Sequence, residues 1–160
     1  MSRADARLVS RFDGPYPRRS RSVSAVFDAS VVVKWFIDDP LADAAIEARK
    51  IHGSAVAPDL MLIEAANVFR RYVVRGELEA SSATENLSVI PQVVDLADHR
   101  ELISEAFDLA CDLNHSMTDC LYAVMARRRG LPLVTADAKL ARKLHAVRDM
   151  DVRLLSSPEI

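Results

Sequence analysis

The chain has 160 residues, of which half are apolar and 28% are charged, a composition typical of one globular domain with its own core. No apolar run approaches the ~20 residues of a membrane-spanning helix, and no apolar segment follows the N-terminal arginines as it would in a secretory signal. The net charge of −2 does not favour a protein that coats duplex nucleic acid. We therefore expect a cytoplasmic protein that makes no contact with a membrane.

The N-terminal residues differ from the rest of the chain. Residues 1–21 contain six arginines and two aspartates, together with Pro15 and Pro17, whereas the remaining residues contain 15 basic and 21 acidic side chains. Polar, arginine-rich sequence of this kind predicts a disordered tail over residues 1–22. We expect residues 23–160 to form a single domain.

The two cysteines favour a reducing compartment. Cys111 and Cys120 both fall in predicted helices among apolar residues, and the sequence has no CxxC motif or Cys/His cluster. We interpret both as reduced core residues rather than as metal ligands.

From residue 23 the chain alternates short apolar runs with amphipathic segments. In chain order, the first half predicts a strand at 23–28, helices at 30–36 and 39–50, a strand at 54–57 and a helix at 59–75. Asp39 followed by Pro40 is typical of a helix start, and Gly76 of a helix end. The first strand ends in a carboxylate, Asp28.

The second half of the chain continues this alternation. It predicts a helix at 82–90, a strand at 92–96, helices at 98–113 and 116–129, a strand at 132–135, a helix from 138 to about 143–145, and a last strand at 151–155. Capping boxes are predicted for the first two of these helices, at Ser82 with Glu85 and at Asp98 with Glu101. The helix at 98–113 carries an apolar stripe made of Leu102, Ile103, Ala106, Phe107, Leu109, Ala110 and Leu113.

Strands that alternate with helices, without hairpin signals, predict the class of fold. They favour an α/β fold in three layers, with a central parallel sheet of about four to five strands and helices on both faces. Ligands of such open sheets bind beyond the carboxyl ends of the strands.

Four carboxylates from distant parts of the chain are expected at that edge of the sheet. Asp28 ends the first strand, and Asp137 follows the strand at 132–135 by two residues. Asp119 lies in the first turn of the helix before that strand. Glu64 lies in the first turns of another helix, within the apolar run LMLIEAA. We therefore expect all four side chains to converge on one crevice.

These carboxylates also have a purely structural interpretation. Asp28 and Asp137 can cap the helices that they precede, and Asp119 can complete a capping box with Ser116. Glu64 is harder to explain in this way, because a charge within an apolar run requires a partner and no base lies within one turn of it.

Carboxylates packed together repel one another and raise one another's pKa values. A divalent cation removes that repulsion, and a set of oxygen ligands without Cys or His favours Mg²⁺ or Mn²⁺ over zinc. Such an ion can activate water and neutralise charge on a phosphate, so that no protein nucleophile is needed. The four acids therefore predict phosphoryl chemistry.

Four sequence segments carry a resemblance to a known family: VFDASVVVKWF, LIEAANVFRR, SMTDCLYAVMARRRG and PLVTADAKLARKL. Over roughly residues 24–156 they resemble the PIN domain, and within it the VapC-type toxins of type II toxin–antitoxin modules. The resemblance implies that Asp28, Glu64, Asp119 and Asp137 are the metal-binding and catalytic acids of a ribonuclease. It also implies an RNA substrate, a cognate antitoxin that blocks the site, and a homodimer. The arginine-rich tail departs from the family pattern, in which the first strand begins near the N-terminus.

Three hydroxyl side chains are candidates for supporting the acids. Ser30 falls where the family often has a small polar residue that supports the site. Thr135 lies two residues before Asp137, where its hydroxyl could orient that carboxylate or bind a phosphate. Thr118 is a candidate of the same kind.

Several basic, histidine and aromatic side chains have both a functional and a purely structural interpretation. Contact with RNA phosphates or with solvent is open for Lys139, Arg142 and Lys143. Arg127–Arg129 close a helix, where the helix dipole and solvent explain them better than RNA does. A surface or capping role is favoured over catalysis for His115, which borders the predicted site. Trp35 and Phe36 are interpreted as core or interface residues, and they would suit a groove for an antitoxin helix if they were exposed.

Three other functions fit part of the pattern. A haloacid-dehalogenase-like phosphatase needs a second Asp two residues after its nucleophilic Asp, but position 30 is Ser. A receiver-like module that accepts a phosphoryl group needs a Lys after a late strand, where this chain has the segment TAD. A PIN-like domain that only binds RNA is not indicated, because all four acids are present.

Overall fold

The computed structural model describes residues 24–156, so the tail predicted at residues 1–22 lies outside the described residues. The described part contains a sheet of five parallel strands in the order β3-β2-β1-β4-β5. The strands are β1 (Ala25–Phe27), β2 (Ala55–Pro58), β3 (Val94–Ala97), β4 (Leu133–Thr135) and β5 (Val152–Leu154). This confirms the predicted parallel sheet. The strand order reverses between β1 and β4, and open α/β sheets bind ligands at the carboxyl ends of the strands at such a position.

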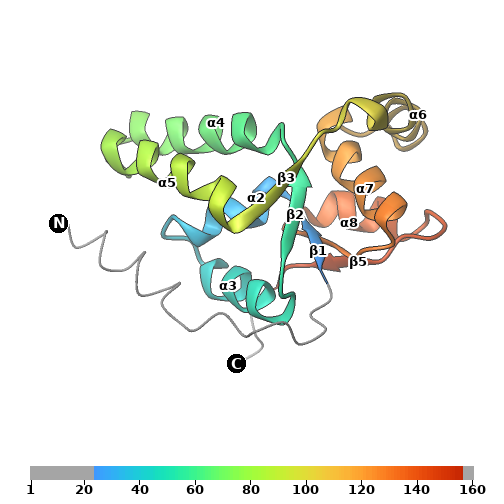
Figure 1. Cartoon of the computed structure of the whole chain (residues 1–160), viewed down its shortest axis with the longest axis horizontal. Helices are drawn as coiled ribbons and strands as arrows, with labels where there is room; N and C mark the ends of the chain where they lie inside the picture. Colours follow the sequence, from blue (N-terminus) through green and yellow to red (C-terminus); the bar gives the residue numbers. More distant parts are fainter. Residues whose placement is uncertain (1–23, 157–160) are drawn as a thin grey trace.

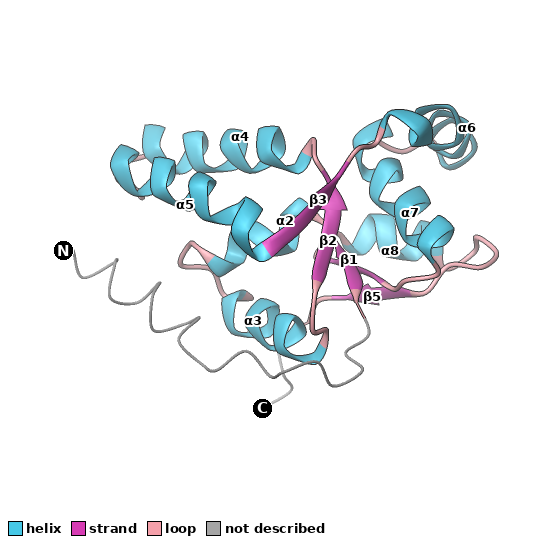
Figure 2. Ribbon diagram, viewed as in Figure 1, coloured by secondary structure: helices cyan, strands magenta, loops and turns pink. Residues whose placement is uncertain are grey.

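Helices surround this twisted sheet (Figures 1 and 2). They are α2 (Ala29–Val32), α3 (Ala42–Ile51), α4 (Met61–Val74), α5 (Ala80–Val93), α6 (Ile103–Leu113), α7 (Met117–Arg129) and α8 (Ala138–Leu144), with short 3₁₀ helices η1 (Val33–Trp35) and η2 (Arg100–Leu102). The helix α7 packs on β1, β2 and β4, while α4 lies beside α5 and α6 lies beside α7. None of the described helices is long and apolar enough to cross a membrane.

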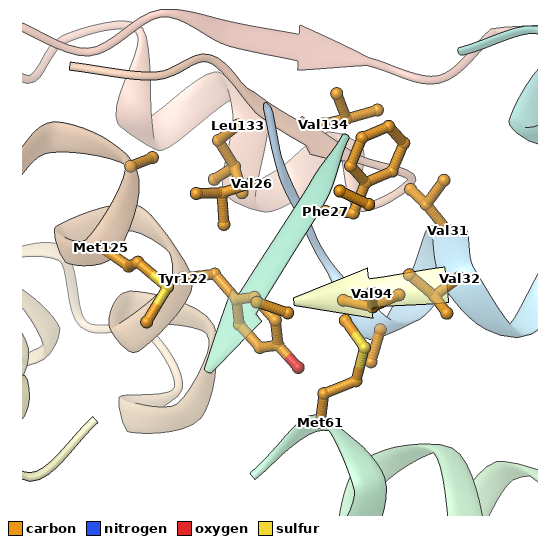
Figure 3. Packing of buried hydrophobic residues seen from close by; sticks show 14 of the residues in the cluster. Val26, Phe27, Val31, Val32, Met61, Val94, Tyr122, Met125, Leu133 and Val134 are labelled. Carbon is orange, nitrogen blue, oxygen red and sulfur yellow. The ribbon is translucent and has the colours of Figure 1, made fainter. Parts of the chain in front are cut away.

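The core is built around β1 and α7 (Figure 3). All three residues of β1 are fully buried, which explains why its sequence is an uninterrupted apolar run rather than an alternating one. Residues 120–126 of α7 are buried on every side of the helix, as expected of a helix that is apolar all round. Val26 and Leu133 of the sheet lie close to Tyr122 and Met125 of α7. This rigid centre holds the carboxyl ends of β1 and β4 next to the first turn of α7.

Two predicted helix starts are wrong. The helix α3 begins at Ala42, because Asp39 uses its carboxylate to accept from the backbone N–H of Leu41 and to pair with Lys34. The helix α5 begins at Ala80 without the predicted capping box and runs through Pro91 to Val93. A proline in the last turn removes one backbone hydrogen bond, and the burial of neighbouring apolar residues such as Ile90 offsets that loss.

The segment before α6 also differs from its prediction. Asp98 accepts from the backbone N–H of Arg100 and pairs with its guanidinium, so a 3₁₀ turn precedes α6 in place of a capping box. The apolar stripe of α6 is narrower than predicted, with Ile103 43% and Phe107 60% exposed. One face of α6 packs on α7, and the second row of apolar residues lies outside that contact.

The structure decides the predictions for the two cysteines and for the aromatic residues Trp35 and Phe36. Cys120 is buried as predicted, but Cys111 is exposed on α6. Trp35 and Phe36 are both buried, which confirms their interpretation as core residues and removes them as an exposed antitoxin groove.

We expect Trp35→Ala to lower the free energy of unfolding by about 3–5 kcal/mol, as large-to-small substitutions of buried aromatic residues do. Trp35 is fully buried, packs edge-on against Phe27 and donates from Nε1 to the carbonyl of Ala45. Val74→Ala is the control, because Val74 is 73% exposed and its loss should change stability by less than about 0.5 kcal/mol. Denaturant unfolding measures both variants, and equal losses would contradict this description of the core.

Candidate active site

Asp28 lies at the carboxyl end of β1 and contacts the carboxyl end of the neighbouring strand β4. It follows β1, precedes α2 and is 5% exposed. Its Oδ1 accepts from the backbone N–H of Ser30 at 3.3 Å, and its Oδ2 accepts from Thr135 Oγ1 of β4 at 2.7 Å. Burial raises the pKa of Asp28, the hydrogen bond from Thr135 opposes that rise, and the charge of Asp119 adds to it. Asp28 is therefore both a helix cap and a buried acid.

Two of the predicted supporting hydroxyls, those of Ser30 and Thr135, connect the segment after β1 with the end of β4 and the loop that follows it. Ser30 Oγ accepts from the backbone N–H of Ala136 at 3.1 Å. Thr135 Oγ1 accepts from the backbone N–H of Asp137 at 3.1 Å while it donates to Asp28. These bonds tie the loop after β4 to the start of α2, so the positions of Asp28 and Asp137 depend on each other.

The two carboxylate oxygens of Asp137 make different contacts. Its Oδ1 caps α8, accepting from the backbone N–H groups of Lys139 and Leu140 at 2.8 and 2.9 Å. Its Oδ2 lies 3.9 Å from Nε2 of His115. The predicted cap is thus present, and one oxygen remains directed toward the acids.

Asp119 forms no capping box with Ser116, which makes no side-chain bond to the helix backbone. Its Oδ2 instead lies 2.9 Å from Nε2 of His115, one turn earlier. Burial raises the pKa of Asp119, the interactions with His115 lower it, and the charge of Asp137 raises it again. Asp119 therefore faces other side chains of the site and not its own helix terminus.

Glu64 accepts hydrogen bonds from hydroxyl groups on α7. Tyr122, whose side chain is fully buried, donates its hydroxyl proton to Glu64 Oε2, and the hydroxyl of Thr118 also hydrogen-bonds Glu64. Burial raises the pKa of Glu64, the bond from Tyr122 opposes that rise, and the charges of Asp28 and Asp119 add to it.

The four acids fall into two connected pairs. Asp119 and Asp137 form a tight group with His115, with one ligand atom of each within 4.8 Å of the others. Asp28 and Glu64 are outside that group but close enough for their charges to act on each other or on Asp119. The structure therefore brings two of the four acids, Asp119 and Asp137, together with His115, and the convergence of all four on one ion stays a prediction.

Two side chains of this site were not assigned to it from the sequence. Tyr122 was not singled out, although its place three residues after Asp119 puts it near the same face of the helix. His115 was interpreted as a surface or capping residue, yet only 7% of its side chain is exposed. The spacing of four residues between His115 and Asp119 was the available signal for their contact.

The site has the charge balance of a cation-binding centre. Among the described residues, hydroxyls, backbone N–H groups and His115 lower the pKa values of Asp28, Glu64 and Asp119, and no lysine or arginine contributes. Neutral donors orient carboxylates without removing their mutual repulsion, whereas a divalent cation does remove it. Of the predicted acids, Asp119 and Asp137 lie with His115 in a group that could hold one ion, whereas Asp28 and Glu64 lie outside that group.

Basic side chains lie at the rim of this site and beyond it. Lys139 and Arg142 are exposed on α8, whereas Lys143 is partly buried and donates from Nζ to the carbonyl of Asn114 at 2.7 Å. Arg127 and Arg128 both pair with Glu105 at 2.6 Å, which ties the end of α7 to α6. That pairing accounts for these two arginines without RNA.

The profile of the PIN domain family matches residues 25–144. The chain belongs to the PIN domain family. It is 30% identical over 131 residues to Ribonuclease VapC3 of Pyrobaculum aerophilum, covering 76% of this chain and 95% of that protein. It is 32% identical over 120 residues to Ribonuclease VapC12 of Mycobacterium tuberculosis, covering 73% of this chain and 89% of that protein. The resemblance of the four sequence segments to VapC-type PIN domains is thereby confirmed.

Solved structures agree on the PIN-domain fold. A crystal structure from Pyrobaculum aerophilum superposes with a TM-score of 0.62 at 21% identity, covering 84% of this chain and 92% of that chain. The VapBC2 structure from Rickettsia felis, bound to a promoter DNA fragment, gives a TM-score of 0.58 at 13% identity, covering 83% and 99%. At these identities the likeness concerns the fold alone.

We expect Asp28→Asn to make the metal-free protein more stable at pH 7. A folded-state pKa above the unfolded value means that the stability from Asp28 is complete at low pH and is lost as the pH rises through the folded-state pKa. The Asn variant has no such loss. In EDTA, its thermal midpoint should exceed that of the wild type at pH 7, and the gap should narrow toward about pH 4, near the usual aspartate value.

Asp108→Asn is the control, because Asp108 is exposed on α6 away from these acids. It should leave the thermal midpoint nearly unchanged at both pH values. A wild type that is more stable than Asp28→Asn in EDTA at pH 7 would show that the buried charge is already compensated.

Proposed function

We propose that this chain is a divalent-metal-dependent endoribonuclease of the VapC type, acting as the toxin of a toxin–antitoxin pair. The observation that carries the proposal is the group of acids from β1, α4, α7 and the start of α8, held by hydroxyls and lacking a lysine or arginine partner among the described residues. The ribonuclease relatives support the choice of RNA as substrate. Such an enzyme would act in the cytoplasm, where RNA and its antitoxin are found.

The cofactor in this proposal is Mg²⁺ or Mn²⁺, held by Asp28, Glu64, Asp119 and Asp137, because carboxylate oxygens suit these hard ions. When bound, the ion lowers the pKa of a water molecule and neutralises charge that develops on the phosphate. The chain itself needs to supply no nucleophile. Ser30, the hydroxyl next to Asp28, is engaged by the backbone N–H of Ala136.

The protein's own contribution is to fix the acids before the substrate arrives. Thr135 and the backbone of Ser30 hold both oxygens of Asp28, and the cap of α8 holds one oxygen of Asp137. Tyr122, whose ring is buried, holds Glu64 through the hydroxyl that donates to Oε2. Acids positioned in this way need little rearrangement during the reaction.

Lys139 and Arg142 remain proposed contacts of RNA phosphates, because both are exposed on the helix that Asp137 caps. Lys143 is a weaker candidate, because its ammonium group already bonds the turn before α7.

The alternative enzymes are less consistent with these contacts. A haloacid-dehalogenase-like phosphatase lacks its second Asp here, and Ser30 in that position bonds the loop after β4. A receiver-like module needs a lysine at the acids, and none of the described lysines lowers the pKa of Asp28, Glu64 or Asp119. A domain that only binds RNA would not need to hold Asp28 and Glu64 in buried positions.

An antitoxin and a second copy of the chain are the proposed protein partners. Similar folds have been solved as a toxin–antitoxin complex from Klebsiella pneumoniae and as VapBC-5 from Mycobacterium tuberculosis, which supports an antitoxin partner. Trp35 and Phe36 are buried and cannot form its binding groove.

The central test is RNA cleavage with added Mg²⁺ or Mn²⁺. We expect EDTA to abolish cleavage and Asp119→Asn to reduce it at least about 100-fold, because the substitution removes a charged oxygen ligand. Asp108→Asn should cleave like the wild type. Cleavage that survives both EDTA and Asp119→Asn would refute a metal nuclease, and a stable phosphoaspartate at Asp28 would favour the phosphatase or receiver alternatives.

A second prediction concerns Tyr122 as a positioning residue. Tyr122→Phe keeps the buried ring but removes the hydroxyl that donates to Glu64 Oε2. We expect metal affinity and cleavage to fall about 10–100-fold, as for other groups that orient ligands. Tyr72→Phe on α4 is the matched control, since Tyr72 is only partly buried and its ring contacts Arg75. Unchanged metal affinity in Tyr122→Phe would show that this hydroxyl serves only packing.

A further inference from the structure

His115 is held rigidly in the turn between α6 and α7. Asn114 adopts a left-handed conformation with φ of 46°, and the backbone N–H of His115 bonds the carbonyl of Ala110 at 3.0 Å. Lys143 of α8 bonds the carbonyl of Asn114 from outside the turn. The imidazole is thereby fixed one helical turn before Asp119, with 7% of the side chain exposed.

The ring nitrogen Nε2 of His115 points at the acids of the proposed metal site. It lies 2.9 Å from Oδ2 of Asp119 and 3.9 Å from Oδ2 of Asp137. Neighbouring ligands on one ion, at bond lengths of about 2.1–2.2 Å, are themselves about 3 Å apart, and opposite ligands are about 4 Å apart. Both distances from Nε2 therefore match the separations of ligands around a single ion, and one ligand atom from each of the three residues lies within 4.8 Å of the others.

We propose that His115 is a nitrogen ligand of the divalent ion and that it makes this site bind Mn²⁺ in preference to Mg²⁺. The inference rests on the proposed function, which requires a divalent ion at these acids. Imidazole nitrogen binds transition-metal ions well, whereas Mg²⁺ is bound through oxygen ligands and water. An imidazole added to the carboxylates of this site consequently shifts its preference from Mg²⁺ toward Mn²⁺.

The alternative role of His115 is to orient Asp119 by a hydrogen bond. Ligation requires the ring proton on Nδ1, so that the lone pair of Nε2 faces the ion, whereas a hydrogen bond to Asp119 requires the proton on Nε2. The two roles differ in their effect on metal selectivity. A ligand contributes more to Mn²⁺ than to Mg²⁺, and an orienting group affects both ions alike.

The test is metal binding by the full chain without an affinity tag. His115→Gln retains a group that can hydrogen-bond Asp119 but removes the ring nitrogen. Calorimetry with each ion should show Mn²⁺ affinity at least about 10-fold weaker in this variant and Mg²⁺ affinity changed less than about threefold. Pulsed electron paramagnetic resonance of bound Mn²⁺ should show imidazole nitrogen coupling in the wild type and none in His115→Gln.

His145→Gln is the matched control, because His145 is exposed at the end of α8 and should leave both signals unchanged. Bound Mn²⁺ without nitrogen coupling in the wild type, or equal weakening of both ions in His115→Gln, would overturn the ligand role of His115. RNA cleavage that still requires a divalent ion would in that case leave the proposed function intact. Failure of the wild type to bind either ion would refute both.

Discussion

The hydrogen bond from Thr135 to Asp28 is the contact on which the site depends. It joins two residues that are 107 positions apart in sequence, at the carboxyl ends of neighbouring parallel strands. The same threonine hydroxyl accepts from the backbone of Asp137, so one side chain positions two acids. The sheet supplies the framework for this contact, because β1 and residues 120–126 of α7 are buried in a close-packed core. Function at this edge is thus a consequence of how the core is packed.

This arrangement buries several carboxylates, and burying their negative charge lowers the stability of the fold. Burial raises the pKa values of Asp28, Glu64 and Asp119, and their neighbours' charges raise them further. Hydroxyls of Thr135 and Tyr122 direct the carboxylates but carry no positive charge. In the proposed function a cation completes the electrostatic balance of this site, and we expect the metal-free protein to be less stable than the same fold with neutral amides at these positions. Residues at functional sites commonly lower stability in this way.

Apolar strands that end in carboxylates follow from simple patterns, so the sequence was sufficient to predict the parallel sheet and to single out four acids, whose shared metal site stays a prediction. It was insufficient where tertiary packing decides the outcome. The helix α5 continues through Pro91 because its apolar side is buried, and Phe107 is exposed because α6 has only one packed face. His115 was missed because its position depends on the left-handed turn at Asn114, and Tyr122 because a polar group at the tip of a core residue leaves no trace in periodicity.

A crystal structure of the protein with Mn²⁺, located by anomalous scattering, tests most directly whether these acids form one metal site. The account predicts an anomalous peak between the carboxylates of Asp119 and Asp137, with Asp28 and Glu64 bound to the ion directly or through water. A peak elsewhere on the protein, or carboxylates that remain paired only with hydroxyls and His115 at saturating Mn²⁺, would contradict it.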